Sequence, residues 1–298
     1  MEYRKARNLC IRLAQTVSAK IGCVQAAHPQ ARYALEQVEL LREMKVDDCG
    51  IEATGVIVEI TAALAEVLPK FIVGDIDEAG AFASLREVVG PFWWARLMQE
   101  PPMQDYAKSC FEFTRMLPHI SGDVLEIGAG VGNYSQLISK IPKKYYRTDI
   151  QRSFLTGQYS KNEFVYDFDA KSDLRNLDMV VSVNGLHCSR DKTKALRNMF
   201  EVLKPGGVIV LAEGEPIVSL SGEPWALGII FSIVSGWWAV GGFETRENWI
   251  SYLKASGFES IGTSRLLESA GNGENQMLDL GGLIWGYRSS KVVSSAYR

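Results

Sequence analysis

The sequence is poor in histidine and cysteine and has no excess of positive charge. Three histidines and five cysteines occur in 298 residues, and 35 acidic residues outnumber 32 basic ones, which gives a formal net charge of -3. The cysteines are scattered and form no C-x-x-C pair, so neither a disulfide framework nor a metal site is expected, and a cytoplasmic location suits them. The lack of a basic excess argues against nucleic acid as a partner.

Long apolar runs are also scarce, with one exception. The stretch 225–243, WALGIIFSIVSGWWAVGGF, carries no charged residue and is just long enough to cross a membrane as a helix. It contains four glycines and lacks flanking lysines or arginines, so we expect a buried cap over an apolar pocket and no membrane span. The N-terminal residues contain no unbroken apolar core and do not resemble a secretory signal.

The periodicity of the apolar residues divides the chain into two unlike parts. Residues 1–118 carry apolar side chains at helical spacing and few strand signals. From residue 119 onward, short β-branched runs alternate with helical segments, which is typical of a parallel sheet covered by helices. We therefore expect an α/β fold with an all-helical N-terminal cap over residues 1–118. The α/β domain should span 119–298, with a lid insertion around 217–244.

The α/β part offers a regular series of expected strands. They fall at residues 123–128, 145–150, 163–168, 178–184 and 206–214, with two closing strands at 258–267 and 277–287. A helix is expected from near Asp191 to the segment KPGG, residues 204–207, where a proline and two glycines enforce a turn. The carboxyl ends of such strands are where open α/β sheets build their sites.

The strongest chemical signal is the glycine motif VLEIGAGVGNYSQ, residues 124–136. Gly128 and Gly130 let the backbone turn sharply and approach a ligand, and a following helix offers free N–H groups. Such turns occur in proteins that bind dinucleotides, flavins or S-adenosylmethionine (SAM). Glu126 favours SAM, because its carboxylate would repel a pyrophosphate but attract the cationic amino-acid portion of SAM.

Acidic residues at the ends of the next two strands extend this candidate site. Asp149 ends the second expected strand, where a carboxylate can accept both ribose hydroxyls, although a turn or capping role is the alternative. Asp167 and Phe168 close the third expected strand, where a carboxylate and an aromatic ring could hold an adenine. Asp169 is a competing candidate for that carboxylate.

The fourth expected strand leads into NGLHCSRD, residues 184–191, which holds one of the three histidines. His187 is a candidate base, and the alternative is a neutral histidine that closes the strand by hydrogen bonds. A nucleophilic pair of His187 and Cys188 is disfavoured, because adjacent residues rarely face each other. His28 and His119 lie outside these motifs, so solvent-facing or capping roles are expected for them.

Together, the motifs VLEIGAGVGNYS, TDI, VNGLH and LKPGG resemble those of the class I SAM-dependent methyltransferases. More narrowly, NGLHCSRD, LKPGGVIVLAE, GWW and the later W..YLKASGF are similar to the C-methyltransferase domains of polyketide synthases, over roughly residues 121–262. The resemblance implies a Rossmann-like sheet, SAM as the cofactor, and Asn184 as part of the cofactor site. It also implies that aromatic side chains wall the acceptor pocket, for which Phe231, Trp237 and Trp238 are the candidates. These rings could instead be core residues only.

By the same resemblance, His187 acts with a glutamate at the end of the following strand, and Glu213 stands there. Methylating carbon requires removal of a proton from between two carbonyls, and an imidazole titrates near neutral pH. Glu213 would orient the ring and stabilise its protonated form. The expected activity is therefore methylation of a carbon next to a carbonyl, in a β-ketoacyl or polyketide-like acceptor.

Two other functions remain open at this point. An O-methyltransferase acting on a phenol or a carboxylate would use His187 to deprotonate or position oxygen. A catalytically inactive subunit with a SAM-binding fold would serve only as a binding partner. If the acceptor is a thioester on an acyl carrier protein, basic residues should surround the site, and four follow the fourth strand: Arg190, Lys192, Lys194 and Arg197. Such runs are more often solvated helix faces.

Overall fold

The computed structural model describes residues 2–46, 55–101, 103–218, 223–269 and 277–289. The contacts within the chain divide it into two compact units. The first unit comprises residues 1–104, 216–242 and 267–280, and the second comprises residues 105–215, 243–266 and 281–298. Cys49, one of the five scattered cysteines, lies outside the described residues, as does Pro102.

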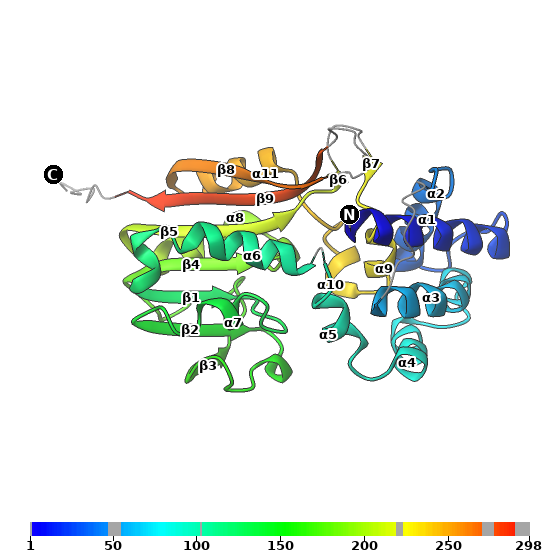
Figure 1. Cartoon of the computed structure of the whole chain (residues 1–298), viewed down its shortest axis with the longest axis horizontal. Coiled ribbons are helices and arrows are strands. Elements are labelled where there is room, and N and C mark those ends of the chain that lie inside the picture. Colours follow the sequence, from blue (N-terminus) through cyan, green and yellow to red (C-terminus); the bar gives the residue numbers. More distant parts are fainter. Residues whose placement is uncertain (1, 47–54, 102, 219–222, 270–276, 290–298) are drawn as a thin grey trace. The chain divides into compact units, whose positions relative to one another are not determined.

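The first unit is built mainly of helices (Figure 1). They are α1 (Glu2–Ile21), α2 (Pro29–Arg42), α3 (Val56–Val73), α4 (Glu78–Val89) and α5 (Trp93–Met98). Helix α1 packs against α2 and α3, and α3 packs against α4. The apolar periodicity is confirmed, since Val38 and Leu41 are buried. His28 has the expected capping role, because its Nδ1 accepts the N–H of Ala31 at 3.1 Å at the start of α2.

A later segment of the chain also belongs to the first unit. It contains β6 (Ile217–Val218), β7 (Glu223–Pro224), α9 (Gly228–Phe231) and α10 (Ser235–Trp238). The guanidinium of Arg7 in α1 donates two hydrogen bonds of 2.9 Å to the carboxylate of Glu223, and the N–H of Ala226 donates to the hydroxyl of Tyr3 at 3.0 Å. The apolar stretch is thus two short helices, and no helix in the described parts of the chain is long and apolar enough for a membrane crossing.

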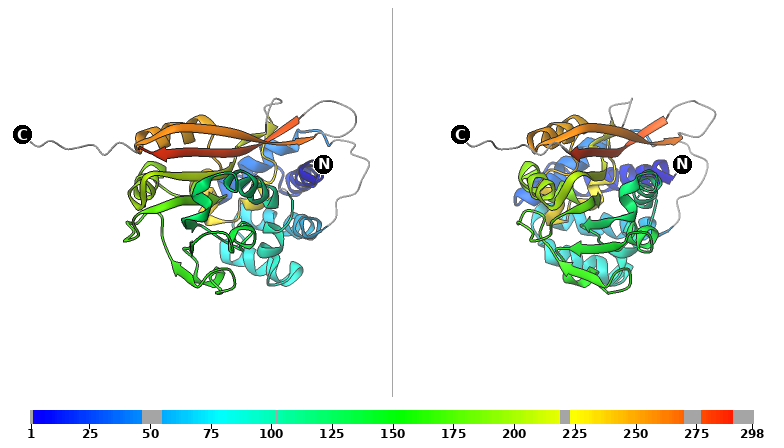
Figure 2. Two further views of the ribbon diagram at one scale, coloured as in Figure 1. Left: turned by 60° about the vertical axis from the view of Figure 1, so that its left-hand side comes forward. Right: turned by 90° about the vertical axis from the view of Figure 1, so that its left-hand side faces the viewer.

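The second unit contains most of a sheet of seven strands in the order β3-β2-β1-β4-β5-β9-β8, in which residues 267–269 of β8 and 277–280 of β9 are grouped with the first unit (Figures 1 and 2). The strands are β1 (Asp123–Ile127), β2 (Lys144–Asp149), β3 (Asn162–Val165), β4 (Leu177–Val183), β5 (Leu203–Gly214), β8 (Phe258–Ser269) and β9 (Met277–Arg288). The first five pair in parallel, and β9 runs antiparallel to β5. The expected α/β fold with a mainly parallel sheet is confirmed. Strand β3 ends at Val165, earlier than predicted, so Asp167 and Phe168 lie in the connection after it.

Helices cover this sheet, and the pleat decides which strand residues face them. On one face, Leu125 and Ile127 of β1 join an apolar core with residues of α8 (Lys192–Val202) and α11 (Arg246–Ala255). Glu126 between them therefore points to the opposite face. Helix α6 (Met103–Thr114) places Phe113 4.5 Å from the ring of Trp285 in β9. The remaining helical elements are α7 (Ser135–Ile138) and the short 3₁₀ turns Pro118–Ser121, Arg152–Phe154 and Leu186–Cys188.

The predicted turn at KPGG lies inside β5. Leu203 pairs with Leu177 and Val208 pairs with Met179 of β4. Between these two pairs β4 continues by two residues and β5 by five. The extra residues form a bulge, in which Gly206 has a φ of 77°. His119 Nε2 donates to the carbonyl of Gly206 at 3.0 Å, so this histidine fastens the bulge at the end of the sheet where β5 begins.

Candidate active site

The predicted site residues fall in both units. Those of the glycine motif, the strand ends and the His-Glu pair belong to the second unit, whereas Phe231, Trp237 and Trp238 belong to the first. Within the second unit, the structure brings His187 together with Glu213 and brings Asp149 together with Gly130. Both pairs lie at carboxyl ends of parallel strands, which is where sites form in open α/β sheets.

The first pair is a buried contact between neighbouring strands β4 and β5. His187 Nδ1 lies 2.8 Å from Glu213 Oε2, and the two side chains are 6% and 0% exposed. The other oxygen of Glu213 accepts the backbone N–H groups of Gly185 and Leu186 at 3.2 and 3.0 Å. The carboxylate is therefore satisfied on both oxygens, as a buried charge requires.

Asn184 sets the turn that delivers His187 to this position. It adopts a left-handed conformation with a φ of 46°, which asparagine tolerates better than most residues. Its N–H donates to the carbonyl of Ala212 at 2.8 Å, and its side-chain oxygen accepts the N–H of Gly214 at 3.2 Å. Asn184 thus hydrogen-bonds the two residues that flank Glu213 in the chain. Its predicted contact with a cofactor remains a prediction.

The surroundings of His187 act on its charge in opposite directions. Burial alone would lower the pKa of the imidazole, but the neighbouring Cys188 and the carboxylate of Glu213 outweigh burial and raise the pKa above its usual value. The ring of Phe243 stands edge-on to the imidazole, with centroids 4.9 Å apart. These surroundings therefore favour the protonated form of the imidazole.

The glycine motif forms an open turn between β1 and a single helical turn, α7. Gly128 and Gly130 have φ values of 63° and 50°, which glycine adopts without strain. A side chain at Gly128 would come within 3.3 Å of the Cα of Gly185, whereas a Cβ at Gly130 would meet no atom within 4 Å. The predicted helix begins only at Ser135.

Asp149 at the end of β2 is bound to this glycine turn. Its two carboxylate oxygens accept the N–H groups of Gly130 and Gln151, both at 2.8 Å, and the residue is 6% exposed. A carboxylate oxygen can accept two hydrogen bonds, so Asp149 retains capacity for the hydroxyls of a ribose. The open space at Gly130 and this acceptor fit the nucleoside part of SAM.

Glu126 lies in a buried polar cluster that sequence reasoning missed. It is 2% exposed and accepts hydrogen bonds from the hydroxyl of Ser135, at 2.6 Å, and from that of Tyr145. Burial raises the pKa of Glu126 to about 7, although the two hydroxyls and the charge of Arg147 lower it. Because successive side chains of a strand point to opposite faces, Glu126 faces away from its apolar neighbours in β1. This alternation was the sequence signal that could have predicted a polar environment for Glu126.

The segment after β3 contains the residues predicted for adenine. Asp167 is exposed and accepts the N–H of Asp169 at 2.9 Å, while Phe168 packs partly buried against the core beside α8. Asp169 instead accepts the hydroxyl of Ser189 at 2.5 Å, which ties this segment to the chain just beyond His187. The assignment of the adenine contact to Asp167 and Phe168 stays a prediction.

The predicted aromatic residues belong to a ring cluster in the first unit. Phe231 and Trp237 have centroids 4.8 Å apart, and Trp225, which the prediction omitted, lies about equally near both, at 5.5 and 5.4 Å. The indole N–H of Trp237 donates to the hydroxyl of Tyr33 at 2.9 Å. Trp238 is half-buried. Their role as an acceptor wall remains a prediction.

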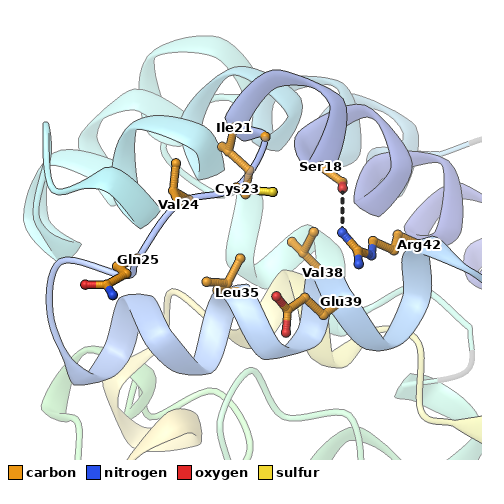
Figure 3. A pocket seen from close by; sticks show the side chains of 10 residues that line it. Ser18, Ile21, Cys23, Val24, Gln25, Leu35, Val38, Glu39 and Arg42 are labelled. Atoms are coloured by element: carbon orange, nitrogen blue, oxygen red, sulfur yellow. Dashed lines mark hydrogen bonds between the residues drawn. The ribbon is translucent and has the colours of Figure 1, made fainter.

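A pocket of about 350 Å³ opens elsewhere in the first unit, between the end of α1, the following loop and α2 (Figure 3). Apolar side chains of both helices line it, and Arg42 donates to the hydroxyl of Ser18 across it at 3.4 Å. None of the predicted site residues lines this pocket, and its wall offers no pair of acid and base resembling His187 and Glu213.

Comparison with protein families and curated proteins identifies related sequences. Residues 125–209 match a family model described as a methyltransferase domain. A highly reducing polyketide synthase of Penicillium decumbens is 30% identical over 169 residues, which cover 48% of this chain and 6% of that protein. A polyketide methyltransferase of Ustilaginoidea virens is 27% identical over 173 residues, which cover 48% of this chain and 37% of that protein. The chain thus spans well under half the length of these relatives.

Solved structures share the fold over nearly the whole chain. The CMeT domain of the citrinin polyketide synthase superposes with a TM-score of 0.69 and 17% identity, covering 96% of this chain and 89% of that one. The trans-methyltransferase CalH, solved in complex with SAH, gives a TM-score of 0.67 and 15% identity, covering 97% and 91%. The chain therefore has the class I, Rossmann-like fold, with residues 125–209 matching a methyltransferase domain, and its resemblance to the C-methyltransferase domains of polyketide synthases is confirmed.

Proposed function

We propose that the chain is a SAM-dependent C-methyltransferase that methylates an activated carbon next to a carbonyl. The observation that carries the proposal is the buried 2.8 Å contact between His187 and Glu213, in the same unit as the glycine motif. SAM binding requires no base, and neither does transfer to an acceptor that is already an anion. A carbon acid must lose a proton first, which gives such a pair a purpose.

The cofactor site would be formed by residues of the second unit. Asp149 would accept the ribose hydroxyls, Gly128 and Gly130 would admit the ligand close to the backbone, and Glu126 would attract the cationic amino-acid portion. Asp167, Phe168 and Asn184 complete the proposed set. When bound, SAM supplies an electrophilic methyl group on its sulfonium. The protein contributes by holding the acceptor and this methyl group in line.

His187 would act as the base through its Nε2 atom. Its Nδ1 donates to Glu213, so the neutral ring presents Nε2 as the proton acceptor. After the α-proton of the acceptor is taken up, the resulting imidazolium is stabilised by the carboxylate of Glu213. Because the pKa of His187 is raised, the neutral ring becomes more abundant as the pH increases above neutrality, so the rate of proton removal should increase with pH.

The acceptor would be a β-ketoacyl or polyketide-like thioester, free or bound to an acyl carrier protein. The relatives named above, a polyketide synthase and a polyketide methyltransferase, support this substrate class. Of the basic residues considered, Arg190, Lys194 and Arg197 are exposed and could meet an acidic carrier. Lys192 is buried and pairs with Glu244 at 3.4 Å, so it is not part of such a surface.

The helical cap, residues 1–118 in the sequence-based division, would contribute to the acceptor pocket together with the lid segment around 217–244. Phe231, Trp237 and Trp238 would supply its aromatic wall. The contacts of Arg7 and Tyr3 with the segment 223–226 support a common role, because they attach the beginning of the lid segment to α1.

The test is product analysis with methyl-labelled SAM and a panel of β-ketoacyl thioesters, each offered free and on a carrier protein. The proposal predicts a product with the label on the α-carbon, found by mass spectrometry and NMR. An acceptor with two α-methyl groups should give no product, because it has no α-proton to lose. A label on oxygen would instead identify an O-methyltransferase, and SAM binding without turnover of the panel would favour the inactive subunit.

A further inference from the structure

Arg147 is a buried cation on β2 with no part in the proposed chemistry. It is 1% exposed, and its guanidinium donates to Glu163 and to three further acceptors from separate segments of the second unit. Nε donates to the hydroxyl of Ser135 at 2.8 Å, Nη1 to the carbonyl of Phe154 at 2.7 Å and Nη2 to the carbonyl of Gly130 at 2.8 Å. One side chain thus joins the glycine turn, the start of α7 and the connection after β2.

Two side chains of β2 hydrogen-bond the backbone N–H and the carbonyl of Gly130. Its N–H donates to Asp149 and its carbonyl accepts from Arg147, each at 2.8 Å. Arg147 and Asp149 are two residues apart on one strand, so their side chains leave the same face. No atom lies within 4 Å of a Cβ built on Gly130, so packing around its Cα does not impose the conformation. The two hydrogen bonds hold Gly130 itself, while its neighbours in the turn are held by backbone bonds from Ala129 to Thr148 and from Gly132 to Ala129.

The charge of Arg147 is balanced inside the same group of segments. Glu163 on β3 lies 3.3 Å from Nη1, with side chains 1% and 7% exposed, and its second oxygen accepts the N–H of Gly157 at 2.6 Å. The ring of Tyr159 lies 5.3 Å from the guanidinium carbon, and the same ring leaves no room for a Cβ on Gly132. A buried ion pair adds little net stability, so the contacts of this pair with three separate segments point to a positional role.

We propose that Arg147 is a positioning residue for the cofactor: it fixes the glycine turn and thereby the orientation of Asp149 toward the ribose. This inference rests on the proposed function, in which the turn binds SAM. Lysine cannot replace arginine here, because a single ammonium nitrogen cannot reach three acceptors that the planar guanidinium contacts in different directions. The glycine motif and Asp149 alone would then be insufficient for tight binding.

The experiment compares Arg147→Lys with Arg288→Lys in the full chain. Arg288 is a matched control, because its Nη1 donates to the carbonyls of Phe200, Glu201 and Leu203 in the same unit, next to β5 and away from the glycine turn. Binding of SAM and of SAH is measured by calorimetry. Amide hydrogen exchange over residues 128–132 is measured in the ligand-free protein, and kcat is measured at saturating SAM.

Arg147→Lys should weaken SAM and SAH binding by about 10- to 100-fold, the range for losing hydrogen bonds to a charged group. Exchange of the Gly130 amide should become faster, while kcat at saturating SAM stays within about twofold, because the base is elsewhere. Arg288→Lys should change none of these. Arg147→Gln, which keeps a donor but no charge, serves as a second variant and should also weaken binding.

Two results of the binding measurements would overturn the inference while leaving the proposed function intact. One is SAM affinity in Arg147→Lys within about twofold of the wild type, which is less than one such hydrogen bond contributes. The other is an equal loss of affinity in Arg288→Lys, which would indicate general destabilisation. If the wild-type protein itself bound neither SAM nor SAH, the proposed function would fail. Unchanged exchange at Gly130 in Arg147→Lys would contradict the positional role whatever the ligand.

Discussion

Glu213 and Glu126, two of the buried carboxylates on the parallel strands of the second unit, are satisfied in different ways. On the β4–β5 side, Glu213 accepts two backbone N–H groups and the imidazole of His187. On the β1–β2 side, Glu126 accepts two hydroxyls, and the nearby cation Arg147 is bonded mainly to backbone and to Ser135. Glu213 therefore helps to raise the pKa of its neighbour His187, whereas the pKa of Glu126 itself is raised to about 7.

This difference indicates that the two sides of the sheet edge serve different functions, control of a proton on one side and binding on the other. A carboxylate fixed by backbone N–H groups beside a buried histidine is suited to controlling a proton. A carboxylate among hydroxyls, joined to the glycine turn through Ser135 and Arg147, is suited to shaping a binding site. If the division is real, substitutions on the β4–β5 side should affect turnover, and those on the β1–β2 side should affect binding.

The largest effect is expected from His187→Ala. Removing the base should lower kcat by about 10²- to 10⁴-fold, the range for a general base, while the affinity for SAM stays unchanged. Turnover is measured with the labelled-SAM assay and affinity by calorimetry. His119→Ala is the matched control, since that histidine hydrogen-bonds the bulge of β5 at the opposite end of the strand. Near-normal turnover in His187→Ala would remove the pair from the mechanism.

The complementary change is Asp149→Ala on the other side. It removes the proposed ribose acceptor and one of the two bonds that hold Gly130, so SAM binding should weaken by about 10- to 100-fold. Asp178→Ala is a suitable control, because Asp178 also accepts a backbone N–H, from Asp123 at 2.7 Å, but lies where β4 begins. An affinity within about twofold of wild type would contradict the ribose assignment.

Glu213→Gln should have a smaller effect, with a characteristic pH dependence. The carboxylate is one of the two groups that raise the pKa of His187, the other being Cys188, so its loss should lower that pKa. The neutral, active ring would then appear at lower pH, so the rising limb of kcat/KM against pH should move to lower pH. Turnover at high pH should fall by about tenfold, because the imidazolium formed in the reaction loses its counter-charge. A profile that does not move would separate Glu213 from the titration of His187.

The motif-bearing half of the site was predictable from sequence because it depends on local order. The glycine turn follows a strand, and the carboxyl ends of adjacent parallel strands meet at one edge, so the order of the motifs along the chain is enough to place Gly130, Asp149, His187 and Glu213 there. The contacts of Arg147 could not be predicted in this way. They depend on the register that pairs Glu126 with Arg147 across β1 and β2, which no local pattern specifies.

The first unit illustrates the same limit over a longer separation. Its helices followed from apolar periodicity, but the grouping of residues 216–242 with α1 depends on contacts such as Arg7 with Glu223, which are 216 residues apart. Similarly, the ring of Trp225 joins Phe231 and Trp237 through a turn in the chain. Side-chain pairs of this kind arise from tertiary packing and carry no signal in spacing alone.

The smallest expected effect concerns the charge of Glu126. With its pKa raised to about 7, this carboxylate is largely ionised at pH 8 and largely protonated at pH 6. The proposed attraction for the cationic portion of SAM should therefore weaken as the pH falls, and SAM affinity should decrease by about three- to tenfold between these values, in proportion to the lost charge.

The control is Glu126→Gln, which has no charge to lose. Its affinity for SAM should be the same at each pH, apart from the titration of SAM itself, which affects both proteins equally. Calorimetry of both proteins at several pH values isolates the contribution of Glu126 as the difference between the two curves. Parallel curves would show that this buried carboxylate acts only on Ser135 and Tyr145, and the ammonium group would then have to be held by the glycine turn alone.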